Sequence, residues 1–127
     1  MRRPGDWFRQ AELDRAAAVD ARGQRHFEWA CFAAHQAAEK AVKAVHQAAG
    51  VEAWGHSVAA LLAGLDDVPS TVTDAAKGLD KHYIPARYPD AHPEGAPGDV
   101  YTDREAALAL DDLERVMEYA RSRLSST

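Results

Sequence analysis

The sequence feature that most constrains the fold is an uninterrupted alanine-rich stretch at residues 27–49. It contains no glycine or proline, and Gly50 follows it where a left-handed C-terminal cap is commonly needed. The stretch predicts a single helix of about 35 Å, because each helical residue advances the chain by about 1.5 Å. A helix of this length spans a small domain, so the remaining elements are expected to pack around it.

Helical spacing places apolar residues on two faces of this predicted helix. One stripe consists of Phe27, Cys31, Ala34, Ala38, Val42, Val45 and Ala49, and the other of Ala30, Ala33, Ala37, Ala44 and Ala48. Because alanine allows a neighbouring helix to approach closely, we expect packing contacts on two sides.

A third line of the same helix is polar and consists of Glu28, His35, Glu39 and His46. One interpretation is a solvated face on which Glu39 pairs with Lys43 one turn later. The other is a ridge that lines a cleft or a subunit interface. The sequence leaves both interpretations open.

Start and stop signals divide the rest of the chain into four further helices. The first is expected at residues 7–22, capped by Asp6, and it should pack as an antiparallel hairpin against the central helix. A short helix follows Ser57, another runs from Ser70 to about Tyr83, and Thr102 with Glu105 forms a capping box for the last. The prediction is an all-α, five-helix up-and-down bundle forming a single domain over residues 1–127.

Composition limits the classes of function. The net charge of −5 gives no general attraction to nucleic acid, so RNA binding would need a local basic patch. Cys31 is the only cysteine, which excludes a disulfide framework and a cysteine zinc site and favours a reduced, cytoplasmic setting. No apolar run is long enough to cross a membrane, and the N-terminus lacks the apolar core of a signal peptide.

Residues 84–101 form a long segment with four prolines and two glycines, which predicts a loop before the last helix. It carries Arg87, Tyr88, Asp90 and His92. Arginine binds phosphate and histidine exchanges protons near neutral pH, so the pair suits metal-free RNA cleavage through a 2′,3′-cyclic phosphate. The alternative is a structural loop in which Arg87 ties down Asp90 or a helix end.

Other chemistries find less support in the sequence. His35 and Glu39 are spaced to hold two metal-ligand positions, but no third ligand is evident, and we expect neither a metal nor a cofactor. The aromatic residues Trp29, Phe32 and Trp54 are interpreted as core or interface rather than as platforms for stacking bases.

The sequence resembles the HEPN domain over nearly the whole chain, and three short motifs carry this resemblance. They are HQAAEKAVKAV at residues 35–45, GHSVAALL at residues 55–62, and YIPARYPD at residues 83–90, which is followed by Tyr101. The resemblance implies an all-α bundle that dimerises. It also implies a role beside a minimal nucleotidyltransferase, in pairs that often behave as toxin and antitoxin.

Catalytic HEPN proteins are metal-independent ribonucleases that use an Arg-x4-6-His motif at the dimer interface, and Arg87 with His92 fits this spacing. The toxin subgroup extends the motif to His-x-Tyr, whereas Pro93 and Glu94 follow His92 here. The ARYPD motif at residues 86–90 resembles that of another branch of the family, for which nucleotide or polynucleotide binding is proposed.

The sequence therefore predicts a cytoplasmic, dimeric, RNA- or nucleotide-binding partner of a nucleotidyltransferase, with ribonuclease activity as an open possibility. In this hypothesis Arg87 holds phosphate and His92 is the acid/base, and the orienting residues are Tyr88, Asp90, His35 and Glu39. The alternative hypothesis is a non-catalytic helical adaptor that binds nucleotides or mediates dimerisation.

Overall fold

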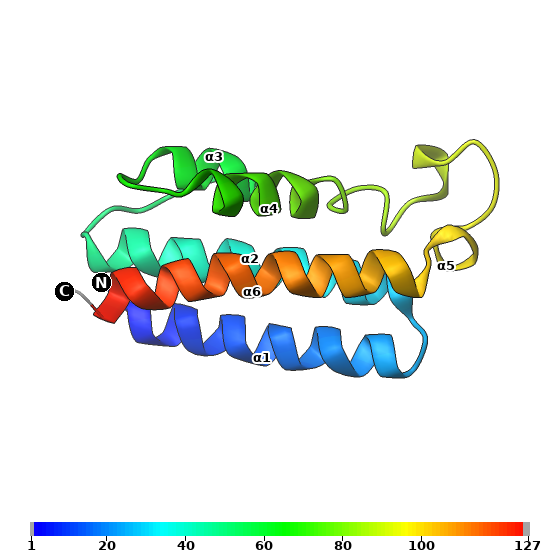
Figure 1. Cartoon of the computed structure of the whole chain (residues 1–127), viewed down its shortest axis with the longest axis horizontal. Coiled ribbons are helices and arrows are strands. Elements are labelled where there is room, and N and C mark those ends of the chain that lie inside the picture. Colours follow the sequence, from blue (N-terminus) through cyan, green and yellow to red (C-terminus); the bar gives the residue numbers. More distant parts are fainter. Residues whose placement is uncertain (1, 126–127) are drawn as a thin grey trace.

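The helices of the protein are arranged as a central pair with one layer of helices on each side (Figure 1). The computed structural model describes residues 2–125, which fold into helices joined by turns and contain no strand. The elements are α1 (Pro4–Gly23), α2 (Phe27–Ala48), α3 (Val58–Ala63), α4 (Ser70–Asp80), a 3-10 turn η1 (Pro89–Ala91), α5 (Pro97–Val100) and α6 (Asp103–Ser125).

α2 is the centre of the fold. It contacts every other α-helix within residues 2–125. In Figure 1, α2 and α6 lie side by side, with α1 on one side of the pair and α3 and α4 on the other. The four longest helices, α1, α2, α4 and α6, alternate in direction along the chain. This arrangement confirms the all-α fold and the helical hairpin of α1 and α2.

Alanines on both predicted stripes of α2 bring the helices close together. Ala34 and Ala38 on one stripe and Ala30 and Ala37 on the other are fully buried. The larger core side chains come from the surrounding helices and include Leu62, Leu79, Leu113, Val116 and Met117. The small residues of α2 thus provide the surface against which larger residues of α3, α4 and α6 pack.

Several local signals act as the sequence predicts. Gly50 has a φ of 79°, the left-handed conformation that favours glycine after a helix. Ser57 Oγ accepts a hydrogen bond from the Ala60 amide at 3.1 Å and caps α3. Thr102 and Glu105 form the reciprocal capping box, with amide-to-side-chain distances of 3.0 Å and 3.2 Å.

Within residues 2–125, the structure corrects the number of α-helices from five to six. α5 forms inside the segment in which we expected no regular helix, because Pro97 occupies its first position, where no amide donor is needed. For the same reason α1 begins at Pro4 rather than Trp7, and Asp6 lies in its first turn rather than at its cap. α4 ends at Asp80, and the chain continues to Arg87 in turns.

The polar line on α2 is not a solvated face, although the ion pair of Glu39 with Lys43 that this interpretation included does form, at 3.2 Å. His35, Glu39 and His46 are 0%, 6% and 7% exposed, because α3, α4 and the segment before α3 cover this face. Each buried polar group has a partner, as burial requires. His46 Nε2, for example, donates to the Leu61 carbonyl at 2.9 Å.

Cys31 lies fully inside the core, and we expect it to be chemically inert in the native protein. Burial raises the pKa of its thiol to about 12, and the negative charges of Glu105 and Glu28 act in the same direction. Only the thiolate is nucleophilic, so a disulfide reagent such as DTNB should react at least about 100-fold more slowly with native than with urea-unfolded protein. Rapid stoichiometric labelling of the native protein would contradict this placement.

No helix in residues 2–125 is both long enough and apolar enough to cross a membrane.

Candidate functional site

The candidate site lies at the end of the bundle where α2 begins and where the segment carrying η1 and α5 leads into α6 (Figure 1). Arg87 is its main cation. The guanidinium carbon lies 4.6 Å from the ring centroids of both Phe32 and Tyr83, and 5.1 Å from that of Tyr88. Three aromatic rings thus hold one positive charge through cation–π contacts.

A hydrogen bond fixes the inner edge of the same guanidinium. Arg87 Nε donates to the Tyr83 carbonyl oxygen at 2.8 Å, in the turns that follow α4. Its two terminal nitrogens donate no hydrogen bond within residues 2–125. Of the two structural roles considered for Arg87, the structure therefore shows attachment near a helix end and not a bond to Asp90. The outer edge of the planar guanidinium remains available to an acceptor with two oxygens, such as phosphate.

Arg87 lines a depression of about 300 Å³ that also includes an exposed indole. The other lining residues are Glu28, Trp29, Ala86, Ala96, Pro97 and Gly98. Trp29 is 51% exposed and packs edge-on against Phe32 with 6.0 Å between ring centroids. Trp54 is 83% exposed, so neither tryptophan lies in the core of the chain, and of the two predicted positions only an interface stays open for them. An exposed indole beside a cation can stack a nucleobase while the cation holds phosphate.

His92 lies in a different environment from Arg87. Its Nε2 donates to the Pro85 carbonyl oxygen at 2.6 Å, and its ring lies edge-on to Tyr101. It lines a separate depression of about 400 Å³, which shares no lining residue with the depression of Arg87. Within one chain, the structure therefore does not show these two predicted catalytic residues in a shared depression.

Of the two other predicted residues on the loop, Tyr88 is at the site and Asp90 is peripheral. Tyr88 is 48% exposed and contacts the guanidinium of Arg87. Asp90 is exposed on η1 and has no hydrogen bond or ion pair within residues 2–125.

Tyr83 connects Arg87 to the polar line of α2. Its ring centroid is 5.2 Å from that of His35 and 5.0 Å from that of His56, and the His56 ring is nearly parallel to it. His56 Nδ1 in turn lies 3.0 Å from Glu39 Oε1, and Lys43 Nζ lies 3.2 Å from the other oxygen of Glu39. His35 thus contacts the Tyr83 ring directly, whereas Glu39 is connected to that ring through His56.

Asp80 ties α2, α3 and α4 together beneath the site. Its carboxylate accepts hydrogen bonds from His35 Nε2 at 3.0 Å and from the Val58 and Ala59 amides at 2.8 Å and 3.1 Å. The Ser57 hydroxyl adds a fourth at 2.9 Å. Burial alone would raise the pKa of Asp80, but these four donors stabilise the carboxylate and hold the pKa below its usual value.

A partly buried pair, Tyr101 with His82, supports the loop on the α6 side. Tyr101 and His82 Nδ1 form a hydrogen bond of 2.9 Å, and burial lowers the pKa of His82. Burial likewise raises the pKa of Tyr101. Both rings are therefore neutral at pH 7, which suits a structural contact.

The sequence alone does not assign roles to Asp80, His56 or His82. Asp80 bonds residues that lie 21 to 45 positions away, and no local pattern reports such distances. His56 offers one signal, since it stands directly before the Ser57 cap of α3, where the chain must turn.

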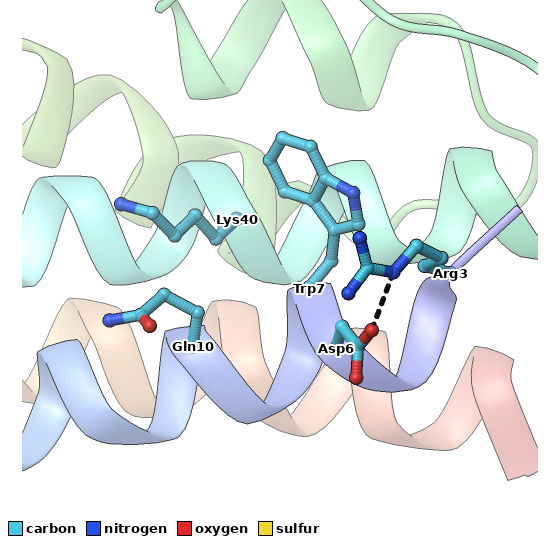
Figure 2. A pocket seen from close by; sticks show the side chains of 5 residues that line it. All are labelled: Arg3, Asp6, Trp7, Gln10 and Lys40. Carbon is cyan, nitrogen blue, oxygen red and sulfur yellow. Dashed lines mark hydrogen bonds and ion pairs between the residues drawn. The ribbon is translucent and has the colours of Figure 1, made fainter. Parts of the chain in front are cut away.

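Another depression, of about 330 Å³, lies between α1 and α2 and is lined by Arg3, Asp6, Trp7, Gln10 and Lys40. Figure 2 shows the Trp7 indole rising from α1 across α2, beside the ion pair of Arg3 with Asp6. That pair is 2.6 Å long, and Lys40 Nζ lies 2.7 Å from an oxygen of Asp14. Because carboxylates of the same chain neutralise these cations, we do not assign a phosphate site here.

The fold and the site define an all-helical bundle protein with an open arginine and aromatic depression between the start of α2 and α5. The sequence model of the HEPN domain matches residues 5–123, and the chain belongs to the HEPN domain family.

Solved structures agree with this assignment. The chain is similar to TT1696 from Thermus thermophilus, with 47% identity, a TM-score of 0.94, and coverage of 97% of this chain and 99% of that one. For ST0689, an archaeal HEPN homologue, the identity is 40%, the TM-score 0.83 and the coverage 96% and 98%. For the HEPN domain protein TM0613 from Thermotoga maritima the values are 34%, 0.78, 96% and 99%. No curated protein sequence matches the chain.

Proposed function

We propose that this protein binds RNA or nucleotides in the cytoplasm and acts as the partner of a minimal nucleotidyltransferase in a toxin–antitoxin-like pair. Binding is supported by one observation: the two terminal guanidinium nitrogens of Arg87 have no hydrogen-bond partner within residues 2–125, and Arg87 shares its depression with the exposed indole of Trp29. The nucleotidyltransferase partner rests on the family resemblance of the residues around Arg87.

The physical case rests on preorganisation. Phe32, Tyr83 and Tyr88 hold the guanidinium in place before any ligand arrives, so little side-chain entropy is lost on binding. The guanidinium donates two hydrogen bonds to phosphate, and Trp29 stacks on the adjoining base. Such stacking contributes about 1–3 kcal/mol to binding. With a net charge of −5, affinity should come from this local site rather than from the overall charge of the protein.

A fluorescence anisotropy titration of a labelled single-stranded RNA in EDTA tests this function. We expect saturable binding that weakens with added salt, because each phosphate that the protein neutralises releases counterions. The salt dependence should be shallow, because few phosphates are neutralised at this site. Absence of binding to single-stranded RNA and to mononucleotides would reject the proposal and favour the adaptor. Co-purification with a co-expressed minimal nucleotidyltransferase tests the partner separately.

The protein is proposed to act as a homodimer. Large apolar side chains near the site, outside the Arg87 depression, remain exposed in the single chain, among them Ile84 and Val100. A second copy that covers them would remove apolar surface from water at about 25 cal/mol per Å². Sedimentation equilibrium should give twice the chain mass of 13.8 kDa, and a stable 13.8 kDa species at micromolar concentration would contradict the dimer.

Metal-independent RNA cleavage is a second candidate function, favoured by the spacing of Arg87 and His92. In a single chain, Nε2 of His92 is engaged by Pro85, so His92 would act through Nδ1 and at a composite site built by two chains. Cleavage in EDTA that leaves 2′,3′-cyclic phosphate ends would support this function. RNA that is bound but stays intact would leave binding as the function.

A further inference from the structure

The depression that holds Arg87 and Trp29 also contains a carboxylate, that of Glu28 in the first turn of α2. We propose that Glu28 makes this site selective for guanine, so that its ligand is a guanine nucleotide, either free or within single-stranded RNA. The inference rests on the proposed function, because it requires a nucleotide phosphate at Arg87.

The carboxylate of Glu28 is open to a ligand. Glu28 is half-buried, and it forms no hydrogen bond or ion pair within residues 2–125, not even with Arg87 in the same depression. No fully buried side-chain oxygen in this part of the chain lacks a hydrogen-bond partner, so both oxygens of Glu28 reach solvent. A ligand can therefore bind them without breaking a contact of the protein.

Gly98 allows the carboxylate of Glu28 to pack directly against α5. A Cβ atom built on Gly98 would lie 2.7 Å from Oε2 of Glu28 and 3.9 Å from Oε1, so any larger residue would displace the carboxylate. Gly98 lines the same depression. The close contact limits the positions open to Glu28 before a ligand arrives, which lowers the entropy lost on binding.

The chemistry of a carboxylate selects one of the four RNA bases. A carboxylate accepts hydrogen bonds and donates none, so Glu28 requires N–H donors on the ligand. Guanine presents two adjacent donors on its pairing edge, N1–H and the 2-amino group, which match the two oxygens of a carboxylate. Adenine and cytosine place a ring-nitrogen acceptor beside their amino group, and uracil flanks its single N–H with two carbonyl oxygens. These acceptors would face a negative charge and be repelled.

One nucleotide can contact Glu28, Trp29 and Arg87 together, because all three line a single depression of about 300 Å³. Glu28 and Trp29 are consecutive on α2, and consecutive helical residues diverge by about 100° around the helix axis. The two side chains can thus approach a base from different directions, Trp29 at its face and Glu28 at its edge. Arg87 would hold the phosphate and supply affinity, whereas Glu28 would supply base selectivity.

Anisotropy titrations of labelled pentanucleotides test this inference. RNAs with a central guanine, adenine, cytosine, uracil or hypoxanthine between uridines carry the same phosphates, so differences in affinity report on the base. We expect guanine to bind at least about tenfold more tightly than uracil, and hypoxanthine, which lacks the 2-amino group, to lose most of this preference. Glu28→Gln should reduce the preference to less than about twofold, because an amide has one accepting oxygen instead of two. Competition with unlabelled GMP distinguishes the free nucleotide from guanine within RNA as the ligand.

Three further variants separate base selectivity from general effects. Glu118→Gln is the matched control, because Glu118 is exposed on α6 and does not line the depression, and it should keep the preference for guanine. Gly98→Ala should weaken the preference, because the added methyl group displaces the carboxylate of Glu28. Arg87→Ala should lower the affinity for all five RNAs by a similar factor, because a phosphate contact carries no information about the base. Circular dichroism melting identifies any variant that has lost its fold.

The outcomes separate this inference from the proposed function. If the wild type binds neither the RNAs nor GMP, the proposed function fails and the inference fails with it. If it binds all five RNAs equally, if it prefers a base other than guanine, or if the guanine preference survives in a folded Glu28→Gln protein, only the inference is overturned. A guanine preference that is lost in Glu28→Gln and kept in Glu118→Gln supports it.

Discussion

Replacing Asp80 with alanine is expected to lower the free energy of unfolding by about 3 kcal/mol. The variant removes the acceptor of four hydrogen bonds that join α2, α3 and α4. Two of the donors are backbone amides at the start of α3, and a third is His35, which is fully buried and has no access to water. The loss should exceed that of an ordinary surface substitution because buried donors are left unpaired.

Urea denaturation followed by circular dichroism measures this effect. Asp74→Ala is the matched control, because Asp74 is an exposed aspartate on the same helix and should change stability by less than about 0.5 kcal/mol. Equal stability of the Asp80→Ala and Asp74→Ala proteins would show that Asp80 does not hold the three helices together.

The contribution of Asp80 should also depend on pH. Its four donors lower its pKa in the folded state relative to the unfolded state, so the folded state favours the ionised carboxylate. The stabilisation is fully present above the unfolded pKa of about 3.9 and is lost as the pH falls through the lower folded value. The stability difference between wild type and Asp80→Ala should therefore be larger at pH 7 than at pH 3.

Replacing Arg87 with alanine is expected to weaken the binding of single-stranded RNA at least about tenfold, which corresponds to one lost charge-assisted contact. Arg87→Lys should restore little of this affinity. A lysine ammonium carries its three donors on a single nitrogen, so it cannot hold the Tyr83 carbonyl at one point and present a planar fork to phosphate at another. The anisotropy titration compares the dissociation constants at one salt concentration.

Arg121→Ala provides a matched control for the loss of an aromatic-stacked arginine. Arg121 lies over the Phe8 ring at 5.5 Å, on the part of the bundle where α1 and α6 meet. Its replacement removes the same charge and the same kind of contact but leaves the depression of Arg87 intact. RNA affinity that falls equally in both variants would indicate general charge attraction rather than a site at Arg87.

The parts of the fold that depend on local rules could be predicted from the sequence. The long α2, the caps at Ser57 and Thr102, and the left-handed Gly50 each follow from residue type and spacing alone. Periodicity also places His35 and Glu39 on one line of α2. It cannot say what faces that line, because their partners Asp80 and His56 lie 45 and 17 residues away.

In the candidate site, too, the residue types could be predicted from the sequence, whereas the contacts between distant residues could not. The sequence singled out Arg87, and the aromatic residues that hold it come partly from the same segment and partly from α2. The pairing of Arg87 with His92 rested on spacing along the chain, whereas Pro85 and Tyr101 decide where the His92 ring lies. α5 was missed because a helix of four residues has no periodicity of its own.

The measurement that tests the central claim most directly is a chemical-shift titration of the ¹⁵N-labelled protein with a short 2′-O-methyl RNA, which cannot be cleaved. The protein has three tryptophans, so the indole N–H signals report separately on the Arg87 depression through Trp29 and on other surfaces through Trp7 and Trp54. We expect the Trp29 indole and the amides of Arg87 and Gly98 to shift saturably while the Trp7 and Trp54 indoles stay in place. Shifts concentrated at Trp7 or Trp54, or no shift at any of the three indoles, would contradict a nucleic-acid site at Arg87.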